Sequence, residues 1–163
     1  MTERKAYIKS WPRQNLAELL QFLEQRHPGG LKLRDFSERS GLTQQYASSI
    51  FRRDDMRLSL AEKIADTYGY QLKLYFPQKE YKFGIVPEGL SKYRKDYPNA
   101  GNLSGLAKYM QDSMRTINSL SEAVGLNYSV IKDAFNKGDI YISTLYKILK
   151  NLNIQVLWSF EKK

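Results

Sequence analysis

Residues 41–53 read GLTQQYASSIFRR, and this stretch sets the fold that the rest of the sequence predicts. Gly41 suits a tight turn, and Thr43 is a good N-cap for a helix that runs to about Arg52. The apolar positions of that helix recur every three to four residues and would face a core. They are Ala47, Ile50 and Phe51. A second stretch, GLNYSVIKDAFNK (125–137), repeats the pattern and indicates an internal duplication.

The duplication covers most of the chain. Aligning Gly41-Leu42 with Gly125-Leu126 keeps apolar positions in register from Ser37 to Phe76. Upstream of HPGGL the shift is three residues larger and pairs Asn15-Leu16 with Asn102-Leu103. We therefore predict two domains, 1–80 and 81–163, and the second begins with a linker over 81–101. Identical residues pair as Ser37-Glu38 with Ser121-Glu122, Phe51 with Phe135, Asp55 with Asp139, Ser59 with Ser143, Lys63-Ile64 with Lys147-Ile148, Gln71 with Gln155 and Phe76 with Phe160.

Each unit is expected to contain short helices followed by one strand, so the fold class is mainly α. In the first unit, helices are predicted over 15–26, 33–39 and about 43–52. Ser59 and Glu62 fit a capping box for a further helix, which Gly69 would end in left-handed geometry. Asn153 holds the corresponding place in the second unit. After these two residues the spacing of apolar residues changes from the three-to-four-residue spacing of a helix to the alternation of a strand.

The two strands, 70–76 and 154–160, lack a partner within their own units. An unpaired apolar edge is a liability, so we expect them to pair with each other, antiparallel, about an internal pseudo-two-fold. The alternating segment YKFGIV (81–86) would add a third strand. The inward faces would carry Tyr70, Leu72, Leu74 and Phe76 from one strand and Ile154, Val156, Trp158 and Phe160 from the other.

Composition narrows the class of function. The 163 residues carry a net charge of +9, which favours an anionic partner. There is no cysteine, and the single histidine, His27, lies where a helix is expected to end. We therefore expect no enzyme, no cofactor and no metal. Asp54 and Asp55 could be a metal pair, but a turn is the favoured role. No signal peptide or membrane span is evident, so a cytoplasmic protein is expected.

The turn in FSERSGLTQQY resembles the helix-turn-helix of the Cro/C1-type (XRE) DNA-binding family, with its lambda-repressor-like fold. The resemblance covers about 15–76 and 102–160. At TQQ the first unit is similar to 434-type phage repressors, whereas AFNKGDIYISTLYKILKNLNIQV in the second is similar to HigA-type antitoxins. Phe51 and Phe135 depart from the family, many of whose members have a glutamate there.

In the first unit, the resemblance implies that Gln44, Gln45 and Ser49 contact bases. Glutamine can pair bidentately with adenine, and a recognition helix enters the major groove with its first turn nearest the bases. Solvent-exposed surface is the alternative reading for the two glutamines. Ser48 follows on the same side and completes the predicted base-contact set. Phosphate contacts are predicted for Thr43, Arg52, Arg53 and Arg34.

The second unit carries different residues at the matching positions. Asn127, Tyr128 and Ser129 occupy the first turn, and Lys132 follows; these four are its candidate base contacts. Asp133 would oppose phosphates if it pointed outward, and a buried or capping Asp133 would remove that objection. A backbone-positioning or partner-binding role for this helix is the rival. Phosphate contacts are assigned to Asn136 and Lys137.

A basic, aromatic stretch, SKYRKDY (91–97), precedes the second unit. Its counterpart AYIKSWP suggests a repeated structural lead-in, in which Trp11 and Tyr97 pack beside the first helix of each unit. Lys92, Arg94 and Lys95 are left as phosphate candidates, as in basic arms.

The favoured function is that of a transcriptional regulator that binds double-stranded DNA in a sequence-specific manner. We expect it to act as a repressor. It would act as a covalent pseudo-dimer, as a monomer or in a homodimer. One alternative is a HigA-like antitoxin that regulates its own gene and binds a toxin. The other is a protein-interaction adaptor that no longer binds DNA. No segment remains for a small-molecule domain, so no ligand pocket is expected.

Overall fold

The computed structural model describes residues 12–76, 97–113 and 115–163. The chain divides into two compact units. The first consists of Met1–Lys73, Tyr141–Tyr146 and Phe160–Lys163, and the second of Leu74–Ile140 and Lys147–Ser159. Trp11, the expected third strand at 81–86, most of the linker and the lysines and arginine of 91–96 lie outside the described residues.

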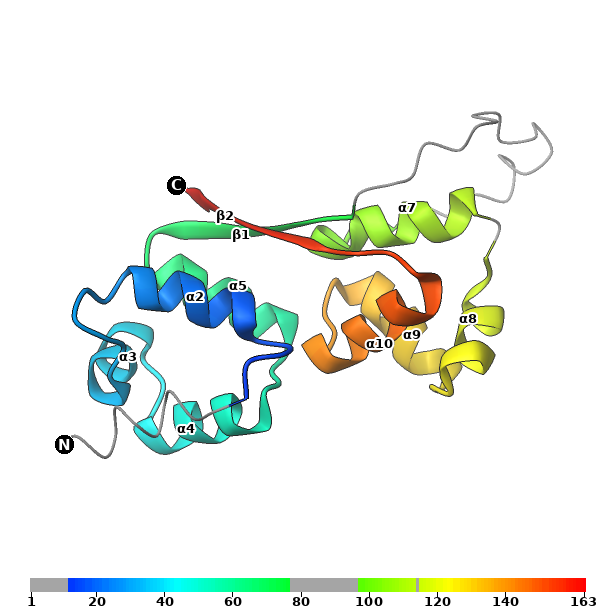
Figure 1. Ribbon diagram of the computed structural model, residues 1–163. Helices are drawn as coiled ribbons and strands as arrows, with labels where there is room; N and C mark the ends of the chain where they lie inside the picture. The colour runs from blue at the N-terminus through cyan, green and yellow to red at the C-terminus, as the bar shows by residue number, and fades with distance from the viewer. Residues whose placement is uncertain (1–11, 77–96, 114) are drawn as a thin grey trace. The chain divides into compact units, whose positions relative to one another are not determined.

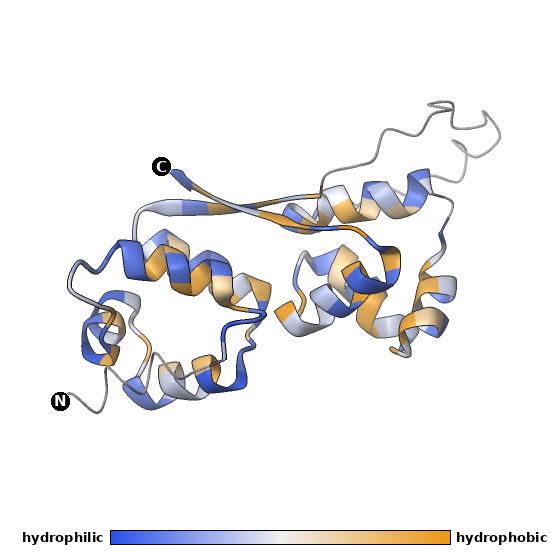
Figure 2. Ribbon diagram, in the orientation of Figure 1, coloured by the Kyte–Doolittle hydropathy of each residue, from blue (hydrophilic) through white to orange (hydrophobic). Residues whose placement is uncertain are grey.

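The described residues of the first unit before Tyr70 form helices α2 (Ala17–Gln25), α3 (Leu33–Ser40), α4 (Gln44–Arg53) and α5 (Leu58–Thr67) (Figure 1). Figure 2 shows α2 with hydrophobic and hydrophilic positions on different sides, as in an amphipathic helix. Burying one large aliphatic side chain completely contributes about 1.5–3 kcal/mol. The core includes Leu16, Leu19, Leu20, Leu23, Phe36, Ala47, Ile50, Phe51, Leu58, Ala61 and Ile64.

Asp54 links the end of α4 to the start of α2. Its backbone adopts left-handed geometry with φ +55°, which confirms the predicted turn, and its side chain is buried. The carboxylate accepts hydrogen bonds from the backbone N–H groups of Gln14 (3.2 Å), Asn15 (2.8 Å) and Leu16 (3.0 Å). These groups precede the first turn of α2 and have no partner within that helix. Asp54 therefore caps α2.

The predicted capping box at Ser59 and Glu62 is wrong. Helix α5 already begins at Leu58, with Arg57 at the N-cap and no side-chain capping hydrogen bond. Leu58 is completely buried, whereas Ser59 is exposed in the first turn. Burial of Leu58 therefore sets the start of this helix two residues earlier than the capping pattern indicated.

The second unit repeats the order of short helices. From residue 97 onward its described residues form, in order, the 3₁₀ turn η1 (Gly101–Leu103), α7 (Ser104–Asp112), α8 (Ile117–Val124) and α9 (Tyr128–Lys137). Helix α10 (Ile142–Leu152) follows, and residues 147–152 of it belong to this unit. Its core includes Leu103, Leu106, Met110, Leu120, Ile131, Ala134, Phe135, Ile148 and Leu149.

Two core residues, Phe51 and Phe135, depart from the pattern of the family that the sequence resembles, and both are well packed. Both are 2% exposed. The ring of Phe51 lies edge-on to Phe36, with centroids 5.3 Å apart. In the second unit the ring of Tyr97 lies 5.5 Å from that of Phe135 in α9, whereas the prediction placed Tyr97 beside the first helix of the unit. Burial raises the pKa of the Tyr97 phenol.

Strands β1 (Tyr70–Tyr75) and β2 (Leu157–Lys162) form a two-stranded antiparallel sheet, which confirms the predicted pairing (Figure 1). In the first unit, Phe160 stacks on Phe22 of α2 at 4.0 Å between ring centroids. Leu72, Leu74 and Trp158 are buried, as expected for the inward face.

The second strand begins three residues later than expected. Asn153 adopts φ +55°, as predicted for the residue that ends the helix. The backbone N–H of Ile154 then donates to the carbonyl of Leu149 at 3.1 Å, which closes the end of α10. Because this amide is used by the helix cap, Ile154 cannot join the ladder, and β2 starts at Leu157. Within the described ranges, no helix is long and apolar enough to cross a bilayer.

Candidate nucleic-acid interface

The turn between α3 and α4 is short and closed by its own hydrogen bonds. Gly41 adopts φ +79°, a left-handed conformation that side chains with a Cβ rarely take. Its N–H donates to the carbonyl of Ser37 at 3.0 Å, and the Ser37 hydroxyl donates to the carbonyl of Leu42. Thr43 is the N-cap of α4, as predicted, and its Oγ1 accepts from the N–H of Tyr46 at 3.1 Å.

The turn between α8 and α9 has the same construction. Gly125 adopts φ +74°, and its N–H donates to the carbonyl of Ser121 at 2.9 Å. The Ser121 hydroxyl donates to the carbonyl of Leu126, as its repeat equivalent does in the first unit. Asn127 occupies the N-cap of α9, yet its side chain makes no capping hydrogen bond. The two turns therefore share their backbone path and differ in the cap.

Helix α4 separates an apolar inner side from a polar outer side. Ala47, Ile50 and Phe51 are buried, as predicted. Gln45 and Ser49 are exposed, and Gln44 and Ser48 are partly exposed. Residues four apart lie above one another on a helix, so the structure groups the four predicted base-contact residues in two adjacent rows.

Positive charge concentrates at the other end of α4. Arg52 and Arg53 lie in its last turn, and both are exposed. Arg34 on α3 is exposed too, but its Nε lies 3.4 Å from Oε1 of Glu38, which offsets part of its charge. Thr43 is exposed, although its hydroxyl oxygen already caps the helix. Arg52 and Arg53 are therefore the stronger candidates for phosphate contacts in this unit.

The outer side of α9 has a different chemistry. Tyr128 is 46% exposed and Val130 is 42% exposed. The ammonium group of Lys132 lies 6.0 Å from the centroid of the Tyr128 ring, within reach of a cation–π interaction. Asn127 and Ser129 are exposed beside them. The predicted base-contact residues of this unit therefore include an exposed aromatic ring, with the exposed aliphatic side chain of Val130 beside them in the sequence.

Asp133 is exposed on α9, so the objection to a phosphate contact there stands. Asn136 and Lys137 are exposed in the last turn, where Lys137 supplies a positive charge. Together with Lys132, the helix carries two cations and one anion on its solvent side. Its electrostatic attraction for a phosphate backbone is therefore weaker than that of α4.

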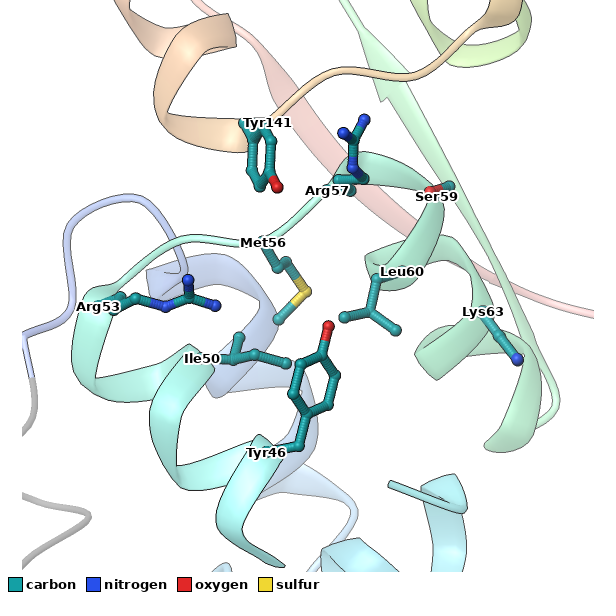
Figure 3. A pocket seen from close by; sticks show the side chains of 9 residues that line it. All are labelled: Tyr46, Ile50, Arg53, Met56, Arg57, Ser59, Leu60, Lys63 and Tyr141. Atoms are coloured by element: carbon teal, nitrogen blue, oxygen red, sulfur yellow. The ribbon is translucent and has the colours of Figure 1, made fainter. Parts of the chain in front are cut away.

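The sequence left no segment for a separate small-molecule domain, and it did not predict a pocket within the first unit. A pocket of about 300 Å³ opens between α4 and α5 in the first unit (Figure 3). It brings together Arg53, which was predicted as a phosphate contact, with Arg57 and Lys63, which were not singled out. The spacing of Tyr46, Ile50 and Arg53 along one side of α4 is the sequence signal that could have indicated it.

The described residues contain no group of three or more histidine and acidic side chains that could hold a metal ion. No protein-family model, curated protein or solved structure gives a significant match to this chain.

Proposed function

We propose that this chain is a regulator that binds double-stranded DNA in a sequence-specific manner. The observation that carries the proposal is the outer side of α4, where Gln44 and Gln45 open a helix that ends in Arg52 and Arg53. A polar first turn next to an arginine-rich last turn suits a helix whose N-terminus meets base edges while its far end meets phosphates. The glycine turn before α4 supports a helix-turn-helix assignment for α3 and α4.

Specificity and affinity would come from different residues. A glutamine amide both donates and accepts, so it can pair with N6 and N7 of adenine. It adds no charge and therefore little attraction for other sequences. Arg52 and Arg53 would attract the phosphates of any DNA sequence. This part of the affinity falls as the salt concentration rises, because counterion release then contributes less.

The second unit supports a covalent pseudo-dimer with two non-identical recognition helices. The α8–α9 turn repeats the glycine conformation and the serine hydrogen bond of the α3–α4 turn. Because α9 presents Asn127, Tyr128 and Ser129 where α4 presents Thr43, Gln44 and Gln45, the preferred site should be asymmetric.

A second candidate function rests on α9 alone. Exposed Tyr128 and Val130 form an apolar surface that suits a protein partner better than a phosphate backbone. Exposed Asp133 points the same way. In this reading, α4 binds DNA while α9 binds another protein, as in an antitoxin that regulates its own gene.

The test is a selection of bound duplexes from a random library, followed by mobility shifts at low and moderate salt. An asymmetric consensus that the full chain prefers over scrambled DNA at moderate salt supports the proposal. Perfect palindromes would point to intermolecular dimers of one unit and contradict the pseudo-dimer. Retention of no duplex at either salt concentration would remove the DNA-binding function.

A further inference from the structure

The pocket between α4 and α5 is built from residues of the first unit (Figure 3). Its floor is apolar: Ile50 is 1% exposed and Met56 is 2% exposed, and Leu60 adds a partly buried wall. A volume of about 300 Å³ is that of a small ligand site, since such sites span roughly 300–1,000 Å³.

The rim of the pocket is positively charged. Arg53, Arg57 and Lys63 line it, and none of the nine lining residues is acidic. In Figure 3 these three side chains lie on three sides of the group formed by Met56 and Leu60. Three cations around an apolar floor favour a ligand that carries negative charge at one end.

Two tyrosines supply the contacts for a flat ring. Figure 3 shows the hydroxyl groups of Tyr46 and Tyr141 directed into the pocket from opposite sides. Both side chains keep exposed surface, at 47% and 44%. The guanidinium carbon of Arg57 lies 4.6 Å from the centroid of the Tyr141 ring, so this cation is already held against one aromatic face. The thioether of Met56 on the floor is a further favourable contact for an aromatic ring.

We propose that this pocket binds an aromatic anion: a small molecule with one planar ring system and one phosphate or carboxylate group. The ring would lie over Ile50, Met56 and Leu60 between the two phenols. The anionic group would be attracted by the positive charges of Lys63 and the two arginines on the rim.

Occupancy would also affect α4, because Tyr46, Ile50 and Arg53 belong to that helix. A bound anion neutralises Arg53, so the ligand should weaken the sequence-independent part of DNA affinity. This consequence rests on the proposed function. Ligand binding itself does not, and it can be measured without DNA.

The experiment is isothermal titration calorimetry of the full chain at low salt with four probes. Adenosine monophosphate and benzoate each combine a ring with an anion, whereas adenosine lacks the anion and inorganic phosphate lacks the ring. At least one aromatic anion should bind once per chain. Adenosine and inorganic phosphate should each bind roughly tenfold more weakly than that aromatic anion, as expected for loss of one charge-assisted contact. Equal binding of all four, or of none, would overturn the inference.

Lys63→Gln tests the location, and Lys147→Gln is its matched control. Lys147 is the repeat equivalent of Lys63, is exposed, and lies outside the pocket lining. Lys63→Gln should weaken binding of the aromatic anion by roughly fivefold, in line with an exposed charge contact of about 1 kcal/mol. Lys147→Gln should leave this affinity unchanged. Tyr46→Ala should weaken it as well, while circular dichroism confirms that the variant is folded.

The outcomes separate this inference from the DNA-binding proposal. If Lys63→Gln weakens duplex binding but no aromatic anion binds, the pocket receives a DNA phosphate, and only the ligand inference fails. If an aromatic anion binds through Lys63 but no duplex is retained, the DNA-binding proposal fails and the ligand site stands.

Discussion

Asp55 and Ser143 are joined by two hydrogen bonds although 88 positions separate them in the chain. The backbone N–H of Ser143 donates to Oδ1 of Asp55 at 2.9 Å, and its hydroxyl donates to Oδ2 at 2.7 Å. Ser143 lies in the first turn of α10, so the carboxylate caps that helix from a distant part of the sequence. Beside this contact, Arg57 and Tyr141 form an antiparallel β-bridge, and the N–H of Ile142 donates to the carbonyl of Met56 at 2.9 Å.

Asp55→Ala should lower the free energy of unfolding by about 1–3 kcal/mol, because it leaves the N–H and hydroxyl of Ser143 without their acceptor. Urea unfolding followed by circular dichroism measures the change. Asp133→Ala is the control, since that carboxylate is exposed and should matter little. In a double-mutant cycle, Asp55→Ala and Ser143→Ala should be non-additive; full additivity would mean that the two residues do not interact.

Gln45→Ala should reduce affinity for the selected duplex by about 1–3 kcal/mol while leaving affinity for random DNA nearly unchanged. The reason is that a neutral amide contributes through base contacts alone. Gln25→Ala on α2 is the matched control, because Gln25 is also exposed and belongs to a different helix. Competition mobility shifts give both affinities. Equal losses on the two DNAs would make Gln45 a non-specific contact.

Asp133→Asn distinguishes the two roles of α9. If α9 lies against a phosphate backbone, removal of the exposed carboxylate should tighten binding to every duplex, by roughly 0.3–1 kcal/mol at low salt. Glu18→Gln on α2 removes an exposed acidic charge elsewhere and serves as the control. Fluorescence anisotropy over a salt series measures both. An unchanged affinity would favour a protein partner for this helix.

Gly138→Ala should be far more harmful than Gly41→Ala. Both glycines have positive φ, at +69° and +79°, which costs a residue with a Cβ about 1–2 kcal/mol. At Gly138 a Cβ would also lie 2.5 Å from the carbonyl oxygen of Asn99 and 2.8 Å from that of Ala100, whereas nothing lies within 4 Å at Gly41. Thermal unfolding of both variants compares them. Equal losses would show that the backbone near Asn99 yields easily.

Tyr68 should make stability depend on alkaline pH. Burial raises its pKa to about 12, and its hydroxyl lies 2.7 Å from Nε2 of His27. The folded state therefore holds the phenolic proton more tightly than the unfolded state does. This stabilisation is complete below about pH 10 and is lost as pH rises through 12. Between pH 9 and pH 11.5, the urea concentration at the unfolding midpoint should fall less in Tyr68→Phe than in the unchanged protein. An equal fall in both proteins would exclude the linkage.

Local signals in the sequence were sufficient for most of the secondary structure. Thr43, Gly69 and Asn153 act where their preferred backbone or hydrogen bonding predicted, and the buried stripe of α4 follows its helical spacing. Local signals failed at two element boundaries. The amide of Ile154 is held by the end of α10, and the burial of Leu58 moves the start of α5.

Periodicity and short-range backbone preferences were enough to predict the repeat, the mainly helical class, the polar outer side of α4 and the antiparallel pairing of the two strands. Tertiary structure alone decided that Asp54 caps α2, that Asp55 caps α10 and that Arg53, Arg57 and Lys63 surround one pocket. Each of these requires side chains from separate elements to meet, and such a meeting is fixed by packing of the whole unit rather than by neighbouring residues.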